Sequence, residues 1–404
     1  MLEPSHPEGA FAIAPLRGAD ELVPVAQGFR GVYLNQLDRQ SAAAWSAAFA
    51  AELWSHIPLA MLRSTVVPHP DDDEAAAFEL VAPSRPAGPT IVVGYDERST
   101  SPDIFTGVVQ GLERMSCQII DIGLRTQPCL SFAVHHLSAD AGFYVTGAGC
   151  DPAWTGFDIR LKHGLPADPS FFERWSALRR QPISRPSRTG SHLRAFPAAV
   201  PYETNLWKYF HALRPLEVVC GSPSPLLIAR LERLFARLPG RLIPVSLPIR
   251  KRNLDDPQDG DLQCVASAVR EHSAHLGIVI DDDAAACAFV DERGQAVGHL
   301  GVSLLAMDHL LRDAPGGLVV LSRAWEKRLG PKSASRGGAV QVVAEAECAA
   351  CLLAADGLLA VSEDHRLWFG GDVPTGDAIV TLAHVMQALS RTDAEFSRVI
   401  AHLR

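Results

Sequence analysis

The sequence predicts an α/β protein of several domains with mixed, largely parallel β-sheets. Short β-branched runs alternate with helical stretches of ten or more residues, which is typical of βαβ units. The chain has 404 residues, enough for more than one domain with its own core. A stretch rich in Pro, Ser, Gly and Arg at 181–198 shows no apolar period and indicates a domain boundary.

The first group of predicted elements precedes that boundary. It contains three strands separated by two helices. In chain order these are "TIVVGYDERS" (90–99), the helix "DIFTGVVQGLERM", the strand "CQIIDIG", a helix around "CLSFAVHHLSA" and the strand "AGFYVTG".

The same pattern returns after the boundary. It is carried by "LEVVCGS" (216–222), the helix "PLLIARLERLFARL" and "RLIPVSL", and later by "GGLVVLS" (316–322) and "GAVQVVAE" (338–345). Because ligands of such sheets bind at the carboxyl ends of the strands, we expect functional loops after Val145, Ile280 and Val361.

Composition excludes several classes of protein. The formal net charge is -9 and no basic stripe is visible, which argues against nucleic acid as a partner. No apolar run reaches the roughly 18 residues of a membrane span, and the N-terminus lacks the pattern of a signal peptide, so we expect a cytoplasmic protein. Residues 65–90, with the acidic cluster 71–74 and several prolines, are expected to form a surface insertion.

Three stretches in a fixed order carry a family resemblance. They are "VVGYDERSTS" to "AGFYVTGAGCDPAWTGFDI", then "HLGIVIDDDAAACAFVDERG" (275–294), then "LLAVSEDHRLWF" (358–369) followed by "TGDAIVTLAHVMQAL". Together they resemble the α-D-phosphohexomutases, the phosphomannomutase and phosphoglucomutase family, over most of residues 90–390. The resemblance implies α/β domains around a central cleft. It also implies phosphoryl transfer by a serine with Mg²⁺, an acid/base group and a phosphate clamp.

The serine loop of the family reads Thr-Ala-Ser-His-Asn-Pro. Here Thr146 matches, but Ala148 stands at the serine, Gly149 at the histidine and Cys150 at the asparagine. The resemblance therefore implies that no side chain carries the phosphate. Cys150 as a replacement nucleophile remains an alternative, although the adjacent Asp151 opposes a thiolate.

The metal loop of the family reads Asp-Gly-Asp-x-Asp-Arg. Asp281 and Asp283 match two ligand positions, whereas Ala285 stands at the third. The resemblance implies a weak or lost Mg²⁺ site, with Asp282 as an alternative ligand. Without a cation, we expect the three aspartates to be held by backbone N–H groups or to face water, so that Asp283→Asn is neutral or slightly stabilising.

The sugar loop of the family reads Gly-Glu-x-Ser-Gly-His. Glu363 is retained, while the serine position is His365 and the histidine position is Leu367. Arg98 matches an arginine near the family's cleft, and it is equally explained as closing a turn with Asp96. Arg98, Glu363 and His365 are the candidate remnants of a sugar contact.

The resemblance divides the chain into three domains. Domain I covers 1–185, with an N-terminal extension and the insertion near 65–90; a linker covers 186–198. Domain II covers 199–297 with the remnant metal loop, and domain III covers 298–404 with the remnant sugar loop. The family's fourth domain, about eighty residues with the phosphate clamp, is expected to be absent.

From these differences to the family motifs, we predict a phosphohexomutase-like protein that is catalytically inactive and has a binding, structural or regulatory role in carbohydrate metabolism. We expect no cofactor and either a protein partner or self-association. One alternative is an active hexose-phosphate mutase, an intramolecular phosphotransferase using relocated groups and Mg²⁺. A second alternative is a sensor whose ligand is a sugar phosphate.

Overall fold

The computed structural model describes residues 22–56, 88–183 and 190–403. Most of the predicted N-terminal extension, and the predicted insertion up to residue 87 with its acidic cluster, lie outside the described residues. Within the described part of the chain, no helix is long and apolar enough to span a bilayer.

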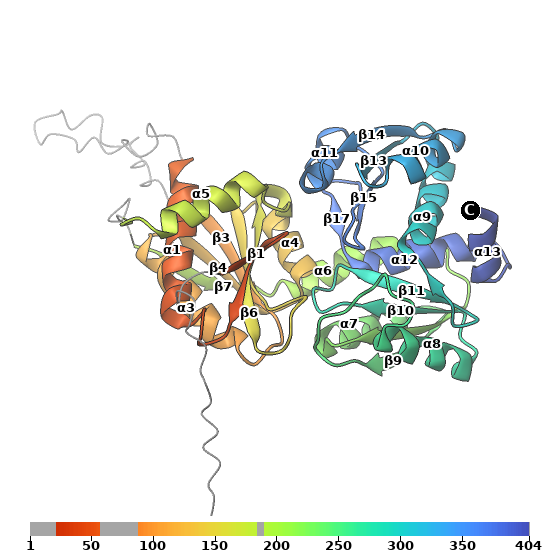
Figure 1. The fold of residues 1–404 in the computed structure, drawn as a ribbon, viewed down its shortest axis with the longest axis horizontal. Coiled ribbons are helices and arrows are strands. Elements are labelled where there is room, and N and C mark those ends of the chain that lie inside the picture. The colour runs from red at the N-terminus through yellow and green to blue at the C-terminus, as the bar shows by residue number, and fades with distance from the viewer. Residues whose placement is uncertain (1–21, 57–87, 184–189, 404) are drawn as a thin grey trace, which may run out of the picture.

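Three β-sheets with helices packed on them form the molecule (Figure 1). The first sheet has seven strands in the order β1-β2-β6-β5-β3-β4-β7. Its strands are β1 (Val23–Val25), β2 (Gly28–Val32), β3 (Thr90–Tyr95), β4 (Gln118–Leu124), β5 (Ala141–Val145), β6 (Trp154–Leu161) and β7 (His192–Ala195).

The second and third sheets have five strands each, in the orders β12-β11-β10-β8-β9 and β14-β13-β15-β16-β17. The strands of the second are β8 (Glu217–Ser222), β9 (Arg241–Ser246), β10 (Leu276–Ile280), β11 (Cys287–Asp291) and β12 (Ala296–Val297). Those of the third are β13 (Leu318–Ser322), β14 (Ala339–Val343), β15 (Leu359–Val361), β16 (Leu367–Phe369) and β17 (Thr375–Gly376).

All three sheets share one plan. The strands on one side are parallel, and those on the other side are antiparallel. The change of direction falls at the β5–β6, β10–β11 and β15–β16 connections. The mixed α/β class is thus confirmed, with a larger antiparallel share than expected, because short connections at these three points return the chain directly beside the preceding strand.

Helices cover the sheets and connect their strands. The α-helices are α1 (Arg39–Ser55), α3 (Ser101–Arg114), α4 (Gln127–His136), α5 (Pro169–Arg179), α6 (Ala199–Leu206), α7 (Pro225–Phe235), α8 (Gly260–His272), α9 (His299–Asp313), α10 (Glu326–Ser335), α11 (Cys348–Ala354), α12 (Ala378–Ser390) and α13 (Phe396–Leu403). The 3₁₀ turns are η2 (Lys162–Gly164), η3 (Trp207–Tyr209) and η4 (Glu345–Glu347).

Helices α1 and α3 cross closely because of two glycines. A Cβ at Gly107 would lie 2.2 Å from the carbonyl oxygen of Arg39, and one at Gly111 would lie 2.1 Å from that of Ala43. These glycines are four residues apart and so share one face of α3. Their lack of a side chain lets the two backbones approach and cover one face of the first sheet.

Two segments depart from the predicted organisation. The linker predicted at 186–198 contains β7, which pairs in parallel with β4 and extends the first sheet. Its four residues are exposed, so no apolar alternation marks them in the sequence. The strands β1 and β2, both short, lie ahead of the predicted core of domain I and also join the first sheet. The remaining domain boundaries stay a prediction.

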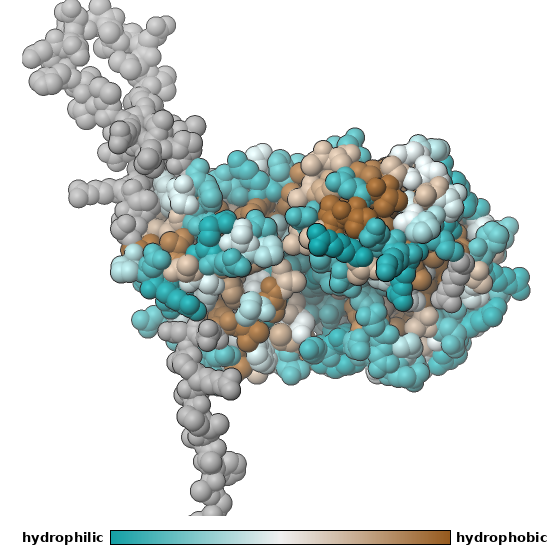
Figure 2. Space-filling model, turned by 45° about the horizontal axis from the view of Figure 1, so that its top comes forward, coloured by the Kyte–Doolittle hydropathy of each residue, from teal (hydrophilic) through white to brown (hydrophobic). Residues whose placement is uncertain are grey.

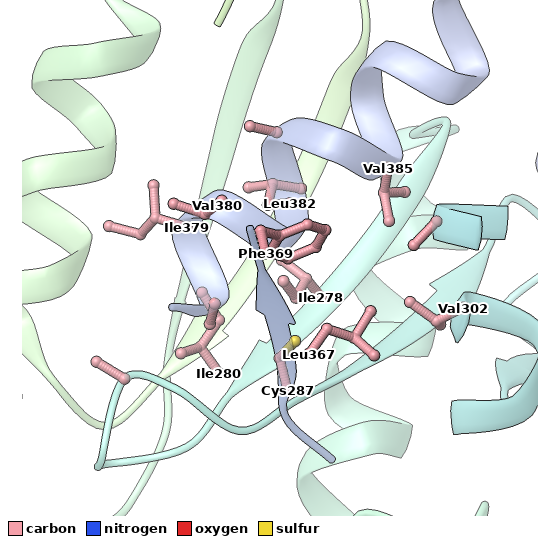
Figure 3. Close-up of a cluster of buried hydrophobic side chains, with 14 of the residues drawn as sticks. Ile278, Ile280, Cys287, Val302, Leu367, Phe369, Ile379, Val380, Leu382 and Val385 are labelled. Carbon is pink, nitrogen blue, oxygen red and sulfur yellow. The ribbon is translucent and has the colours of Figure 1, made fainter. Parts of the chain in front are cut away.

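Helix α12 is buried on all sides between the second and third sheets. Every residue from Ala378 to Leu389 is buried, which is the pattern of a helix enclosed by a core rather than lying on a surface. Figure 3 shows Ile379, Val380, Leu382 and Val385 of α12 beside side chains of β10 and β16. The second and third sheets therefore share one hydrophobic core.

Polar side chains cover most of the face shown in Figure 2, and one apolar patch interrupts them on the third domain. It lies over β14 and α11, at the outer edge of the third sheet.

Candidate functional site

The three predicted functional loops meet at one cavity. They are the β5–β6, β10–β11 and β15–β16 connections, which occupy the same position in the three sheets. The cavity has a volume of about 400 Å³. Its lining consists of Val25, Ala26, Gln27, Arg30, Ala148, Gly149, Cys150, Asp158, Arg252, Asn253, Leu254, Asp255, Asp281, Asp283, Ala286, Glu363, Asp364, His365 and Arg366.

The first loop is a tight turn held by its own polar groups. The Thr146 hydroxyl donates to Asp96 over 2.8 Å and accepts from the Ala148 N–H over 2.9 Å. Gly149 has a φ of 75°, which glycine adopts without strain. Ala148, at 8% exposure, directs no polar side-chain atom into the cavity. The loop is therefore rigid and presents a methyl group where the resemblance has a serine.

Cys150 is the nearest alternative nucleophile, and its surroundings do not activate it. Burial raises the pKa of the Cys150 thiol despite the opposing effect of Arg30 and Arg98. A catalytic cysteine needs a lowered pKa, because the thiolate is the nucleophile. The geometry gives no support to this alternative.

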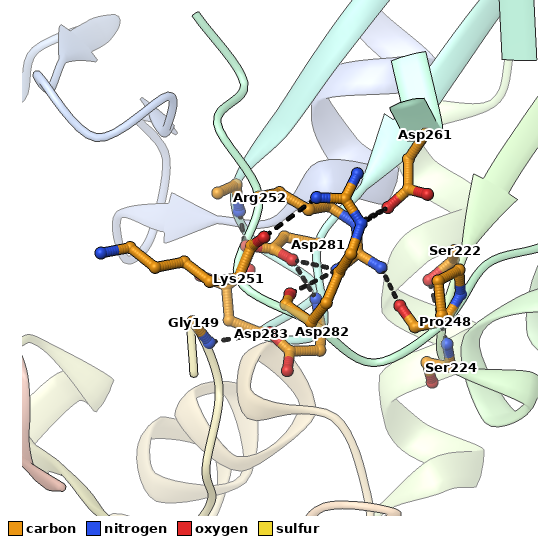
Figure 4. Close-up of polar contacts among 12 residues, drawn as sticks. Gly149, Ser222, Ser224, Pro248, Lys251, Arg252, Asp261, Asp281, Asp282 and Asp283 are labelled. Atoms are coloured by element: carbon orange, nitrogen blue, oxygen red, sulfur yellow. Dashed lines mark hydrogen bonds and ion pairs between the residues drawn. The ribbon is translucent and has the colours of Figure 1, made fainter. Parts of the chain in front are cut away.

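Each aspartate of the second loop is paired with an arginine. Arg252 donates to Asp281 over 2.7 Å, Arg98 donates to Asp282 over 2.6 Å, and Arg366 donates to Asp283. Figure 4 shows Arg252 reaching Asp281 and Gly149 reaching the same turn. The sequence-based expectation of backbone N–H partners or water is therefore incomplete, since guanidinium groups supply most of the neutralising charge.

The pKa values of Asp281 and Asp283 are shifted in opposite directions. Burial and the neighbouring Asp282 and Asp283 raise the pKa of Asp281 to about 7, although Arg252 opposes this. Burial alone would raise the pKa of Asp283. Arg366 and the N–H groups of Ala285 and Ala286 outweigh this effect, so the pKa of Asp283 lies below its usual value. The Asp283 carboxylate is thus the firmly ionised member of the turn.

This donor set does not fit Mg²⁺. The N–H groups of Ala285 and Ala286 donate to one oxygen of Asp283 over 2.8 and 2.9 Å, and the guanidinium of Arg366 pairs with the other. Mg²⁺ needs oxygen ligands in near-octahedral geometry, and cations already occupy these carboxylates. Within residues 22–56, 88–183 and 190–403, no group of three or more His, Cys, Asp or Glu side chains is arranged to hold a metal ion.

Arg98 lies outside the cavity lining and links two loops. Its guanidinium donates to the carbonyl oxygens of Asp151 and Cys150, both over 2.8 Å, and to Asp282. It also lies 3.5 Å from Asp96, the partner expected from the turn. Both sequence-based interpretations of Arg98 are thus incomplete, because neither includes the hydrogen bonds by which its side chain connects the first loop to the second.

The third loop brings Glu363 and His365 to the cavity. Glu363 accepts a hydrogen bond from Ser322 over 3.2 Å, and His365 lies 3.0 Å from Asp255 of the second domain. The His365 ring centre is 5.0 Å from that of His299, which begins α9. The loop therefore lies against the second domain through His365 and against its own domain through Glu363.

His299 should make stability depend on pH. Burial, and then the charge of His365, lowers the pKa of His299 to about 4. The unfolded chain takes up this proton near pH 6.5, so the stability that depends on neutral His299 is present above that pH and lost as the pH falls towards 4. Between pH 7 and 5, His299 should account for a loss of about 2 kcal/mol in the free energy of unfolding.

Urea unfolding of the wild type and His299→Gln at pH 7 and pH 5 measures this contribution. Asp281 acts in the opposite sense, because its raised pKa makes the stability it contributes disappear as the pH rises towards 7. The test is therefore the difference between the two proteins, which should change by about 2 kcal/mol from one pH to the other. His272→Gln, at an exposed position, serves as the control. If the free energy of unfolding changed equally between pH 7 and pH 5 in His299→Gln and in the wild type, the prediction would be contradicted.

Sequence reasoning missed three arginines of the site. Arg30 of β2 pairs with Asp158 over 2.8 Å and donates to the carbonyl oxygen of Ala148 over 3.1 Å. Arg252 and Arg366 are the partners described above. The one available signal was the basic run 250–252, which stands out in an acidic chain. Arg30 lies in a segment that the sequence pattern did not assign to the fold.

Three equivalent loops thus converge on one cavity in a multi-domain α/β protein. Residues 74–175 match the family described as phosphoglucomutase/phosphomannomutase, alpha/beta/alpha domain I. Residues 74–175 thus match the first domain of this family, and most of the chain is similar to proteins named as phosphohexomutases.

Two similar relatives are a phosphoglucomutase/phosphomannomutase of Thermococcus kodakarensis and a protein of Xanthomonas campestris named phosphohexose mutases. The first is 24% identical over 340 residues, which cover 78% of this chain and 72% of the relative. The second is 29% identical over 246 residues, which cover 57% of this chain and 53% of the relative. The chain thus spans between about half and three quarters of the length of these relatives.

The fold matches that of a solved structure. A phosphoglucomutase/phosphomannomutase family protein from Burkholderia thailandensis superposes with a TM-score of 0.76 at 19% identity. The superposition covers 94% of this chain and 79% of that protein. At this identity, the likeness establishes the common architecture.

Proposed function

We propose that this phosphohexomutase-like protein does not transfer phosphate and has a binding or structural role in carbohydrate metabolism, in the cytoplasm. The observation that carries the proposal is the pairing of Asp281, Asp282 and Asp283 with three arginines. Phosphoryl transfer needs cations that face the transferring group, because charge stabilisation is most of its catalysis. Here the cations face the carboxylates of the protein itself.

The first loop supports the same conclusion. Alanine at 148 has no oxygen to accept a phosphoryl group, and the raised pKa of Cys150 disfavours the thiolate. Asp158, which lines the cavity, pairs with Arg30. The positions of the phosphate carrier and of the metal ligands are therefore altered together.

The turn 281–283 instead ties the three domains together. Asp282 bonds to Arg98 and to the N–H of Gly149 in the first domain. Asp283 bonds to Arg366 in the third. Buried ion pairs of this kind fix the relative position of the segments that they join. Removing one partner lowers the free energy of unfolding strongly, because the other charge is left buried and unpaired. Such links favour a fixed arrangement of domains around the cavity.

A mutase assay with Mg²⁺ tests the proposal. Wild-type protein with glucose 1-phosphate or mannose 1-phosphate, bisphosphate activator and Mg²⁺ should show no turnover near the usual range of about 1–10³ s⁻¹. Ala148→Ser should remain inactive as well, because a serine alone does not free the carboxylates from their arginines. Turnover by the wild type would refute the proposal.

Mg²⁺ is not expected to stabilise the fold. A ligand at 100 times its dissociation constant stabilises the folded state by about 2.7 kcal/mol, which a thermal melt detects easily. Since the aspartates are already paired with arginines, we expect equal melting temperatures with and without Mg²⁺ at roughly 10 mM. A rise that Asp283→Asn abolishes would establish a metal site and contradict this expectation.

A second candidate is a sensor for a neutral sugar. The cavity of about 400 Å³ is within the range of small-molecule sites. Acidic side chains outnumber arginines in its lining, and Arg30, Arg252 and Arg366 are each paired with one of them. This charge balance favours hydroxyl groups over a phosphate dianion. Thermal melts with mannose and glucose beside their 1-phosphates separate the two ligand classes, and a shift caused only by the phosphates would contradict this candidate.

A further inference from the structure

The parallel side of each sheet ends in an edge strand, and only one of the three is unprotected among the described residues. An open edge presents unpaired N–H and C=O groups, which proteins usually guard with charges or proline. Strand β7 carries His192 and Arg194, and β9 carries Arg241 and, in its interior, Pro244. Strand β14 reads Ala-Val-Gln-Val-Val and has neither a charged residue nor a proline. It pairs only with β13, and no described strand lies on its other edge.

The surface around this edge is apolar. Figure 2 shows the patch over β14 and α11. Val342, Val343, Cys351 and Leu353 are partly exposed there, and Ala354 is exposed. A contiguous apolar patch beside an open strand edge is typical of an interaction surface. None of these residues lines the cavity between the domains, so the patch is separate from that site.

The hydrogen bonds of β14 show which of its groups are free to pair. The Ala339 N–H donates to the carbonyl oxygen of Gly317 over 3.0 Å, so the backbone of Ala339 faces β13. Alternate residues of a strand direct their backbone groups to opposite edges. The N–H and C=O groups of Val340 and Val342 therefore face outward, with Gln341 between them.

We propose that two copies of this chain pair through β14 in antiparallel orientation, with Gln341 opposite its counterpart in the second copy. In this register, Val340 of each copy lies opposite Val342 of the other. Both residues direct their N–H and C=O groups to the open edge, so each pair exchanges two hydrogen bonds. The two five-stranded sheets then form one continuous sheet across a twofold axis.

The sequence around Gln341 favours a second copy over an unrelated strand. Valines flank Gln341 on both sides, and small apolar residues follow at Ala339 and Val343, so the strand is nearly symmetric about its centre. A second copy in antiparallel orientation therefore presents to β14 the same residue pattern that β14 presents to it.

Charge substitution at the symmetric position tests the register. Gln341 is exposed, and in the proposed dimer its side chain lies directly opposite the Gln341 side chain of the second copy. Full-length Gln341→Lys and Gln341→Glu proteins should each dimerise at least about tenfold more weakly, because like charges meet across the axis. An equimolar mixture of the two variants should recover dimers, because opposite charges then meet. Sedimentation velocity measures the three cases, and Ser246→Lys and Ser246→Glu on the β9 edge are matched controls.

The outcomes are distinct. Wild-type dimers, monomeric or weakened single variants and recovery on mixing would support the proposal. A wild-type protein that stays monomeric up to roughly 100 μM, where dimers with dissociation constants in the micromolar range would form, would overturn it. Dimers unaffected by either Gln341 substitution would also overturn it, as would a mixture that does not recover, because each result places any contact elsewhere. Circular dichroism of each variant verifies folding, and the mixture keeps the test valid even if one variant is less stable.

Discussion

Replacing Arg98 with alanine is expected to lower the free energy of unfolding by about 4 kcal/mol. Arg98 is 4% exposed, and its guanidinium lies against Asp96, Asp282 and the carbonyl oxygens of the first loop. Its removal leaves the buried Asp282 carboxylate without its cation and the carbonyl oxygens without a donor. Urea unfolding monitored by circular dichroism measures the loss.

A cycle of variants separates the ion pair from the packing of Arg98. Asp282→Asn alone should also be destabilising, while the double variant should cost less than the sum of the two, by about 1–3 kcal/mol. Arg39→Ala is the control, because Arg39 is exposed in its pair with Asp103 and should cost about 1 kcal/mol or less. Equal losses for Arg98→Ala and Arg39→Ala would show that the buried pair is not a structural link.

Asp283→Asn should cost about 3 kcal/mol of stability. This reverses the sequence-based expectation of a neutral or slightly stabilising change, which assumed a carboxylate without a cation beside it. Asp283 is buried and pairs with Arg366, and it accepts hydrogen bonds from two backbone N–H groups. Asparagine can keep the N–H bonds but leaves the Arg366 guanidinium without its buried anion.

The matched control uses the same arginine. Asp364 also pairs with Arg366, but its side chain is 35% exposed. Water therefore screens that pair, and Asp364→Asn should cost about 1 kcal/mol or less. Chemical unfolding of the two variants gives the comparison. If Asp364→Asn were the more damaging change, the buried pair with Asp283 would not be the main contact of Arg366.

The general architecture could be predicted from the sequence because it depends on local patterns. Apolar strands followed by helical stretches identify the parallel side of each sheet, and the loops after Val145, Ile280 and Val361 lie where the strand ends place them. The short strand β7 escaped prediction, since its residues are all exposed and show no alternation.

The partners of the three aspartates could not be predicted in the same way. Arg98 and Asp282 are 184 positions apart, and Arg366 and Asp283 are 83 apart. No periodicity joins residues so distant, because their proximity arises only when separate sheets pack together. The motif of three aspartates identified the carboxylates, but nothing in the sequence indicated their partners. Only the packed structure shows that each of them pairs with an arginine.

Helix α12 has a consequence for how the chain is made. The ribosome delivers residues in order, and early domains commonly fold before later ones emerge. Here the N–H of Ala378 bonds to the carbonyl oxygen of Ala284, and Gln387 bonds to that of Tyr209, so a late helix completes contacts begun nearly two hundred residues earlier. Until α12 emerges, Ile278 and Phe369 lack the helix that covers them. If the chain folds in the order of its synthesis, the apolar surface of the second sheet that α12 covers therefore stays exposed until α12 has been made.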